Sequence, residues 1–301
     1  MFHAVAVAES DGVLGCVAIF ADRVEIDCDT ERRADFVLAA VASADGAAFV
    51  VKHRHVRAEQ IAHFETFGFL VLRKVFTVDE IATIKRESDE IFSEGLGNTL
   101  PHGRVALQPF FERGPFMSAL VADDRIYGIG ESLLGPDFFL CLTEGNLHVG
   151  DTFWHGGGKW DEECRSVKIT FYPESLTATT GSLRVVPGSH RRGSPDLFES
   201  LRYGNRDPDF RPFGMRQSDI PSVALELEPG DLAVFTEETL HAAYGGHDGR
   251  HQHAINFMEN PTTESKKQDI IDFYESSRYS LRPSESYVNS DSPRIRRLVA
   301  T

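Results

Sequence analysis

The feature that most constrains the fold of this 301-residue chain is a series of short strand-like segments between about residues 138 and 260. Clusters of Gly, Pro, Ser and Asp separate these segments. Such punctuation is typical of the antiparallel sheets of a sandwich or barrel and disfavours a parallel α/β sheet, which needs a helix between successive strands. The segments are FFLCLTEGNLHVG, SVKITFYPESL, SLRVVPGS, VALELEPGDLAVF, LHAAYGG and HQHAINFME.

Helical patterns flank this region. Thr77 and Glu80 form a capping box ahead of a long amphipathic segment. We therefore expect a mainly β domain with flanking helices over residues 56–301, preceded by a small α+β extension over residues 1–55. The segments that predict helices are RADFVLAAVA in the extension and RAEQIAHFETF, VDEIATIKRESDEIFSEG, FMSALVADDRIYGIGESLL and SKKQDIIDFYESS in the domain.

Charge and composition narrow the range of partners. A formal net charge of −15 disfavours binding to a nucleic acid polymer, whose phosphates would be repelled. We see no basic leader and no apolar stretch long enough for a membrane span. The four cysteines show neither paired metal spacing nor a disulfide framework. We expect a cytoplasmic protein with a small-molecule substrate and no membrane or carrier-protein partner, since an acidic surface would not favour an acidic carrier.

The run His155-Gly156-Gly157-Gly158 suggests several kinds of site. An esterase oxyanion loop would require a serine in a G-x-S-x-G elbow, which the chain lacks. A phosphate-binding loop would require Ser or Thr where Trp160 stands. A flexible loop with an incidental histidine is the plainest alternative. The remaining possibility is a metal site in which His155 pairs with His241 on a neighbouring strand, as in non-haem iron centres completed by one carboxylate.

The sequence around these histidines resembles the phytanoyl-CoA dioxygenase-like family of iron(II)- and 2-oxoglutarate-dependent oxygenases. The resemblance extends over about residues 57–300 and rests on an ordered series of motifs. These are HFETFGFLVLRKVFTVDEI, GNLHVGDTFWH, FYPESLTATTGSLRVVPGSHRRG, LEPGDLAVFTEETLHA and NSDSPRIRR.

The resemblance implies a double-stranded β-helix, or jelly roll, with iron held by an H-x-D motif and a distal histidine. His155 matches the first ligand and His241 the distal one. Arg250 matches the arginine that binds the far carboxylate of 2-oxoglutarate, a role suited to a planar guanidinium. Asn146 and Thr152 are further candidates for contacts with the co-substrate, although either could be an ordinary polar strand residue.

The chain departs from the family at Gly157, which stands where H-x-D has its aspartate. Glycine offers no ligand, and the same alteration marks the halogenases of this superfamily, in which chloride binds iron instead. We therefore expect an iron(II), 2-oxoglutarate, O2 and chloride-dependent halogenase that acts on an unactivated C–H bond of a small natural-product precursor. By resemblance alone that precursor is a nucleoside or nucleotide.

Other readings remain open. A hydroxylase could recruit its carboxylate from Asp161, Glu162 or Glu163, just downstream of the motif. A catalytically silent metal or ligand binder would also fit the motif. A zinc site could instead use a set of three histidines, since His247, His251 and His253 follow His241.

Overall fold

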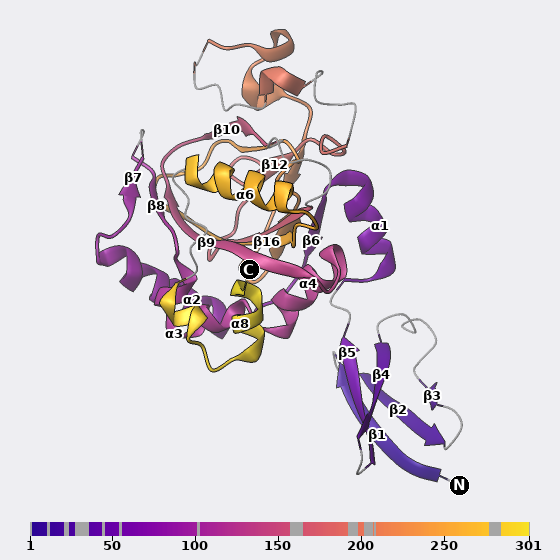
Figure 1. Ribbon diagram of the computed structural model, residues 1–301. Helices are drawn as coiled ribbons and strands as arrows, with labels where there is room; N and C mark the ends of the chain where they lie inside the picture. Colours follow the sequence, from indigo (N-terminus) through magenta and orange to yellow (C-terminus); the bar gives the residue numbers. More distant parts are fainter. Residues whose placement is uncertain are drawn as a thin grey trace. The chain divides into compact units, whose positions relative to one another are not determined.

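The computed structural model describes residues 2–10, 13–20, 24–27, 36–43, 46–53, 56–100, 103–156, 165–191, 198–201, 207, 209–276 and 284–300. The chain divides into two compact units, Met1–Arg57 and Ala58–Thr301, which are considered separately (Figure 1). Among the described residues, no helix is long and apolar enough to cross a membrane.

The described part of the first unit consists of strands. The strands β1, β2 and β3 form an antiparallel sheet, and β4 pairs with β5 in a hairpin. The helix predicted for residues 33–42 was wrong, because β4 occupies Phe36–Ser43. Its Val37 and Val41 are β-branched, which favours a strand, and residues 36–43 pair with residues 46–53 of β5. The bounds are β1 Phe2–Ser10, β2 Val13–Phe20, β3 Val24–Asp27 and β5 Gly46–His53.

The helix α2 of the larger unit begins at the signal expected from the sequence. Thr77 caps α2, and Glu80 completes the capping box by accepting from the Thr77 backbone N–H. The long helix predicted from Phe116 is two helices, because Asp123 caps a new start at Asp124. The helices are α1 Ala58–Phe67, α2 Val78–Ser93, α3 Pro115–Leu120, α4 Asp124–Leu134, α6 Glu264–Ser276, α7 Glu285–Val288 and α8 Pro293–Val299. Short 3₁₀ turns lie at Phe111–Arg113, Glu199–Leu201, Pro212–Gly214 and Gln217–Asp219.

Two antiparallel sheets form the body of this unit (Figure 1). The major sheet has the strand order β6-β14-β11-β16-β9-β8-β7, and the minor sheet has the order β10-β15-β12-β13. This arrangement is the expected jelly roll. The strands are β6 Phe69–Leu72, β7 Asn98–Thr99, β8 Val105–Leu107, β9 Phe138–His148, β10 Thr152–His155, β11 Ser166–Phe171, β12 Leu183–Val185, β13 Val223–Leu225, β14 Leu232–Phe235, β15 His241–Ala243 and β16 Arg250–Glu259.

The space between the sheets is apolar at one side and polar at the other. Phe69 and Phe235 of the major sheet pack against Leu183 and Val185 of the minor sheet. Along β16, by contrast, alternate residues direct Arg250, Gln252 and Asn256 towards the minor sheet. Because buried polar side chains require partners, this polar half of the interior is where a site is expected.

Candidate functional site

The structure brings His155 and His241 together across the minor sheet. Their Cα atoms are paired between β10 and β15, and their ring centroids are 4.1 Å apart. Trp154, which precedes His155 on β10, turns to the outer face and packs with Leu240 and Ala242. The two histidines predicted as ligands therefore face the interior of the jelly roll.

Hydrogen bonds orient both imidazoles as metal ligands. The Nδ1 atom of His155 lies 2.8 Å from the Phe153 carbonyl oxygen, and the Nδ1 atom of His241 lies 2.8 Å from that of Thr239. A carbonyl oxygen only accepts, so each ring carries its hydrogen on Nδ1 and leaves a lone pair on Nε2. Burial lowers the pKa of His155 to about 4 and that of His241 well below its usual value. Both rings are therefore neutral at pH 7, as iron binding requires.

The third ligand position lies outside the described residues, which stop at Gly156 and resume at Arg165. The structure therefore tests neither the role of Gly157 nor a recruited Asp161, Glu162 or Glu163. Within the described ranges, no group of three His, Cys, Asp or Glu side chains could hold a metal. No described carboxylate thus completes the histidine pair.

The local backbone geometry requires glycine at position 156. Its φ is +123°, and a Cβ there would lie 2.5 Å from the Thr239 carbonyl oxygen. That oxygen is the acceptor that orients His241. The first glycine of the run is therefore required for the close approach of β10 to the segment before β15, whatever the chemistry at position 157.

Arg250 is a buried cation with no anionic partner among the described residues. Its side chain is 1% exposed, and Nε and Nη1 have no partner among the described atoms. Burial lowers its pKa, yet a guanidinium stays charged in proteins. An unpaired buried charge is costly unless a ligand neutralises it. The arginine thus fits the predicted far carboxylate of 2-oxoglutarate.

Two glycines make room for this guanidinium. A Cβ on Gly246 would lie 1.3 Å from Arg250 Nη1, and one on Gly181 would lie 2.4 Å from it. Gly246→Ala should therefore displace the guanidinium and weaken 2-oxoglutarate binding about tenfold to a hundredfold, as Arg250→Ala should. Anaerobic isothermal titration calorimetry would measure this. Gly249→Ala has nothing within 4 Å of its Cβ but a φ of +78°, so it serves as the control for backbone strain in the same turn without displacement of Arg250. Equal affinity in the Gly246 and Gly249 variants would contradict the assignment.

A polar network extends from Arg250 along β9. Asn146 accepts from Nε and Nη2 of Arg104 at 3.1 and 2.6 Å. His148, paired with Arg250 across the strands, lies 2.7 Å from Gln252 Oε1 through Nε2, and its Nδ1 lies 3.3 Å from Thr152 Oγ1. Asn146 and Thr152 thus lie near the proposed co-substrate end, and their contact with it stays a prediction. Sequence reasoning missed Arg104, because only strand pairing brings β8 beside Asn146.

The other histidines do not join the pair. His251 contacts Asp89 of α2 at 3.0 Å, and His253 contacts Ser88 of α2 at 2.9 Å, so both lie on the face of β16 opposite Arg250. His247 is exposed. A zinc site built from these residues and His241 has no support in the described structure.

The buried ring of His253 gives a prediction for stability. Burial lowers its pKa to about 3, and the ring stacks on Phe171. Between about pH 6.5 and pH 3 the unfolded chain therefore binds a proton here that the folded chain does not. This costs up to about 1.4 kcal/mol of unfolding free energy for each unit by which the pH falls. His253→Phe should reduce that slope by the same amount, measured by urea unfolding at several pH values. Equal slopes would contradict the assignment.

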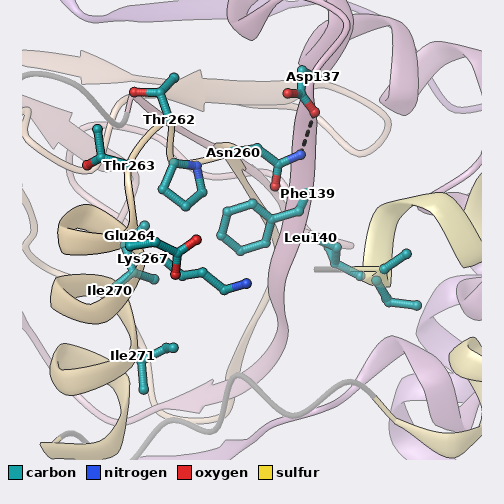
Figure 2. Close-up of a pocket in the computed structure, with 13 residues that line it drawn as sticks. Asp137, Phe139, Leu140, Asn260, Thr262, Thr263, Glu264, Lys267, Ile270 and Ile271 are labelled. Atoms are coloured by element: carbon teal, nitrogen blue, oxygen red, sulfur yellow. Dashed lines mark hydrogen bonds between the residues drawn. The ribbon is translucent and has the colours of Figure 1, made fainter.

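A separate cavity of about 450 Å³ lies at the start of β9 (Figure 2). Phe139 of β9 and Lys267 of α6 extend into it, and Asn260 donates to Asp137 beside it. None of its lining residues is a predicted site residue. The cavity is therefore distinct from the histidine pair.

Comparison with solved structures supports the fold. The chain resembles the epimerase SnoN in complex with Fe³⁺, alpha ketoglutarate and nogalamycin RO, with a TM-score of 0.54 and 19% identity over 66% of this chain and 82% of SnoN. It also resembles EctD from S. alaskensis with 2-oxoglutarate and 5-hydroxyectoine, with a TM-score of 0.53 and 19% identity over 77% of this chain and 86% of EctD. The domain has the fold of the iron- and 2-oxoglutarate-dependent oxygenases.

Sequence comparison adds a partial match to one family and a distant relative. The phytanoyl-CoA dioxygenase (PhyH) family model matches residues 143–251, a segment that includes His155, His241 and Arg250. The ectoine dioxygenase of Sphingopyxis alaskensis is 25% identical over 221 residues, which cover 63% of this chain and 71% of that protein. The predicted fold is thereby confirmed, and the match to the family model agrees with the predicted family. The name of this relative agrees better with the hydroxylase alternative than with the halogenase. The names of these three proteins give no support for chloride as a cofactor.

Proposed function

We propose that the jelly-roll domain holds iron(II) through His155 and His241 and 2-oxoglutarate through Arg250, and that it chlorinates an unactivated C–H bond of a small molecule. The fit of the residues supports the two cofactors. Two neutral imidazoles with free Nε2 lone pairs suit iron, and a buried guanidinium without a partner among the described atoms suits a carboxylate.

The single observation that carries chlorination is Gly157. It replaces the carboxylate of the family's H-x-D motif, and no described carboxylate takes its place beside the histidines. Loss of an anionic ligand leaves the centre one negative charge short, which favours uptake of an external anion. Chloride is the anion that the halogenase resemblance implies.

The residues of the chain have distinct roles in this scheme. His155 and His241 orient the metal from the minor sheet, and the carbonyls of Phe153 and Thr239 keep their rings in the required tautomer. Arg250 binds the far carboxylate of the co-substrate. When bound, iron with 2-oxoglutarate and O2 supplies an oxidant able to attack an unactivated C–H bond. The apolar packing around Phe235 and Leu183 keeps bulk water from one side of the site.

Hydroxylation is the second candidate, and the similarity to an ectoine dioxygenase favours it. In this case Asp161, Glu162 or Glu163 would supply the missing ligand. The reaction would then insert oxygen and would not depend on halide.

A chloride titration separates the two candidates. The protein is loaded anaerobically with iron(II) and 2-oxoglutarate, and the visible charge-transfer band is followed as chloride is added. A saturable shift of the band is expected for the halogenase. A band that does not respond to chloride would favour the hydroxylase, and the absence of any band would overturn both.

A further inference from the structure

The polar half of the interior has two ends of opposite charge. Arg250 and Arg104 make the end near His148 basic, which suits 2-oxoglutarate. At the other end lies a group that we name the acidic cluster: Glu144 of β9, Glu237 and Glu238 between β14 and β15, and Lys168 of β11. This end contains three carboxylates and one ammonium group among its described residues.

Direct contacts hold the acidic cluster together. Lys168 Nζ lies 2.6 Å from Glu144 Oε1 and 3.8 Å from Glu237 Oε1. Ser166 Oγ donates to Glu238 at 3.3 Å. The Lys168 side chain is 14% exposed and that of Glu237 is 28% exposed. Lys168 is thus closer to Glu144 than to Glu237. Glu237 remains partly exposed to solvent.

The acidic cluster lies beside the histidine pair. Lys168 is paired across the strands with Phe235, whose ring centroid is 4.8 Å from that of His241. Arg250 lies at the opposite end of β16 from Asn256, the partner of Lys168. The cluster therefore lines the part of the interior that 2-oxoglutarate would leave to the substrate.

A second observation points to a ligand there. Asn256 is 3% exposed, and its Nδ2 donates to Glu144 Oε1 at 2.8 Å. Its Oδ1 has no donor among the described atoms. The alternative amide orientation would put Oδ1 against a carboxylate oxygen, so the orphan is an acceptor. A buried acceptor without a donor is costly, and a ligand N–H would satisfy it.

We infer that the acidic cluster and Asn256 bind a protonated amine of the substrate and so select a cationic small molecule. This inference rests on the proposed function, because it concerns the substrate of the same site. The charges of Glu144 and Lys168 offset each other, and burial raises the pKa of Glu237 and raises that of Glu238 to about 7. A bound ammonium group would favour the ionised form of both carboxyl groups, and Asn256 Oδ1 and Glu237 would accept its N–H groups. The phosphate of a nucleotide would be repelled here, so the predicted nucleotide substrate fits this end poorly.

Matched probes test the inference. Hexylammonium, hexan-1-ol and hexanoate share one carbon skeleton and differ in the charged group. Binding of each is measured by isothermal titration calorimetry to the full chain, both metal-free and loaded anaerobically with iron(II) and 2-oxoglutarate. The variants are Glu237→Gln and Glu238→Gln, and the control is Glu90→Gln, which makes the same charge change on the exposed surface of α2.

The expected result is that hexylammonium binds at least about tenfold tighter than hexan-1-ol in both forms, and that hexanoate binds weakest in the loaded form, where 2-oxoglutarate occupies Arg250. Glu237→Gln should raise the dissociation constant of the amine about tenfold and leave that of the alcohol unchanged. An amine that binds no tighter than the alcohol would overturn the inference, as would cluster variants that behave like Glu90→Gln. Because the metal-free titration needs no iron and the chloride titration needs no amine, either proposal can fail without the other.

Discussion

Replacement of either His155 or His241 by alanine is expected to abolish iron(II) binding. Each ring supplies one Nε2 lone pair, and Gly157 offers no side chain to compensate. Loss of a residue that only orients a metal ligand lowers affinity about tenfold to a hundredfold, so loss of the ligand itself should cost more. Anaerobic equilibrium dialysis followed by metal analysis would measure the effect.

A matched control separates ligand loss from a general effect of removing histidine. His247→Ala removes an exposed imidazole six residues after His241 and should leave one bound iron per chain. Far-ultraviolet circular dichroism would establish that each variant is folded. Full iron stoichiometry and affinity in the His155 or His241 variant would contradict the two-histidine centre.

Gly157→Asp should have the second largest effect, on the outcome of the reaction. It restores the H-x-D motif, so an aspartate would compete with chloride for the same coordination position. The charge-transfer band of the iron- and 2-oxoglutarate-loaded variant should no longer respond to chloride at concentrations that saturate the native chain. Oxygenation or loss of turnover is expected in place of chlorination.

The same substitution tests the hydroxylase alternative. If Asp161, Glu162 or Glu163 already supplies the ligand, a further carboxylate at position 157 changes little, and the native chain and the variant should give the same spectrum. A triple variant, Asp161→Asn with Glu162→Gln and Glu163→Gln, provides a second test of the recruited carboxylate. Iron binding that survives this triple replacement unchanged would exclude a recruited carboxylate.

Much of the fold could be predicted because its signals are local. Turn clusters between short apolar segments indicated a sandwich or barrel, the family resemblance implied the jelly roll, and the capping box at Thr77 marked the start of α2. The two histidines could be proposed as a pair from the family motifs, and the register of β10 and β15 confirms that they lie together. Whether they bind iron is a question for the experiments above.

The rest depends on contacts between distant strands. Arg104 meets Asn146, and Lys168 meets Glu144, only through the pairing of β8, β9, β16 and β11. Spacing along the sequence does not predict such contacts. The pattern at residues 33–42 predicts a helix, and its alanines favour one, whereas pairing with β5 makes residues 36–43 a strand.

X-ray absorption spectroscopy at the iron edge tests the central claim most directly. The protein is loaded anaerobically with iron(II), 2-oxoglutarate and chloride, and the spectrum reports the atoms bound to iron. The account predicts two imidazole ligands, the oxygens of 2-oxoglutarate and one chloride scatterer, which is absent from the Gly157→Asp variant. A shell of nitrogen and oxygen alone, identical with and without chloride, would contradict it.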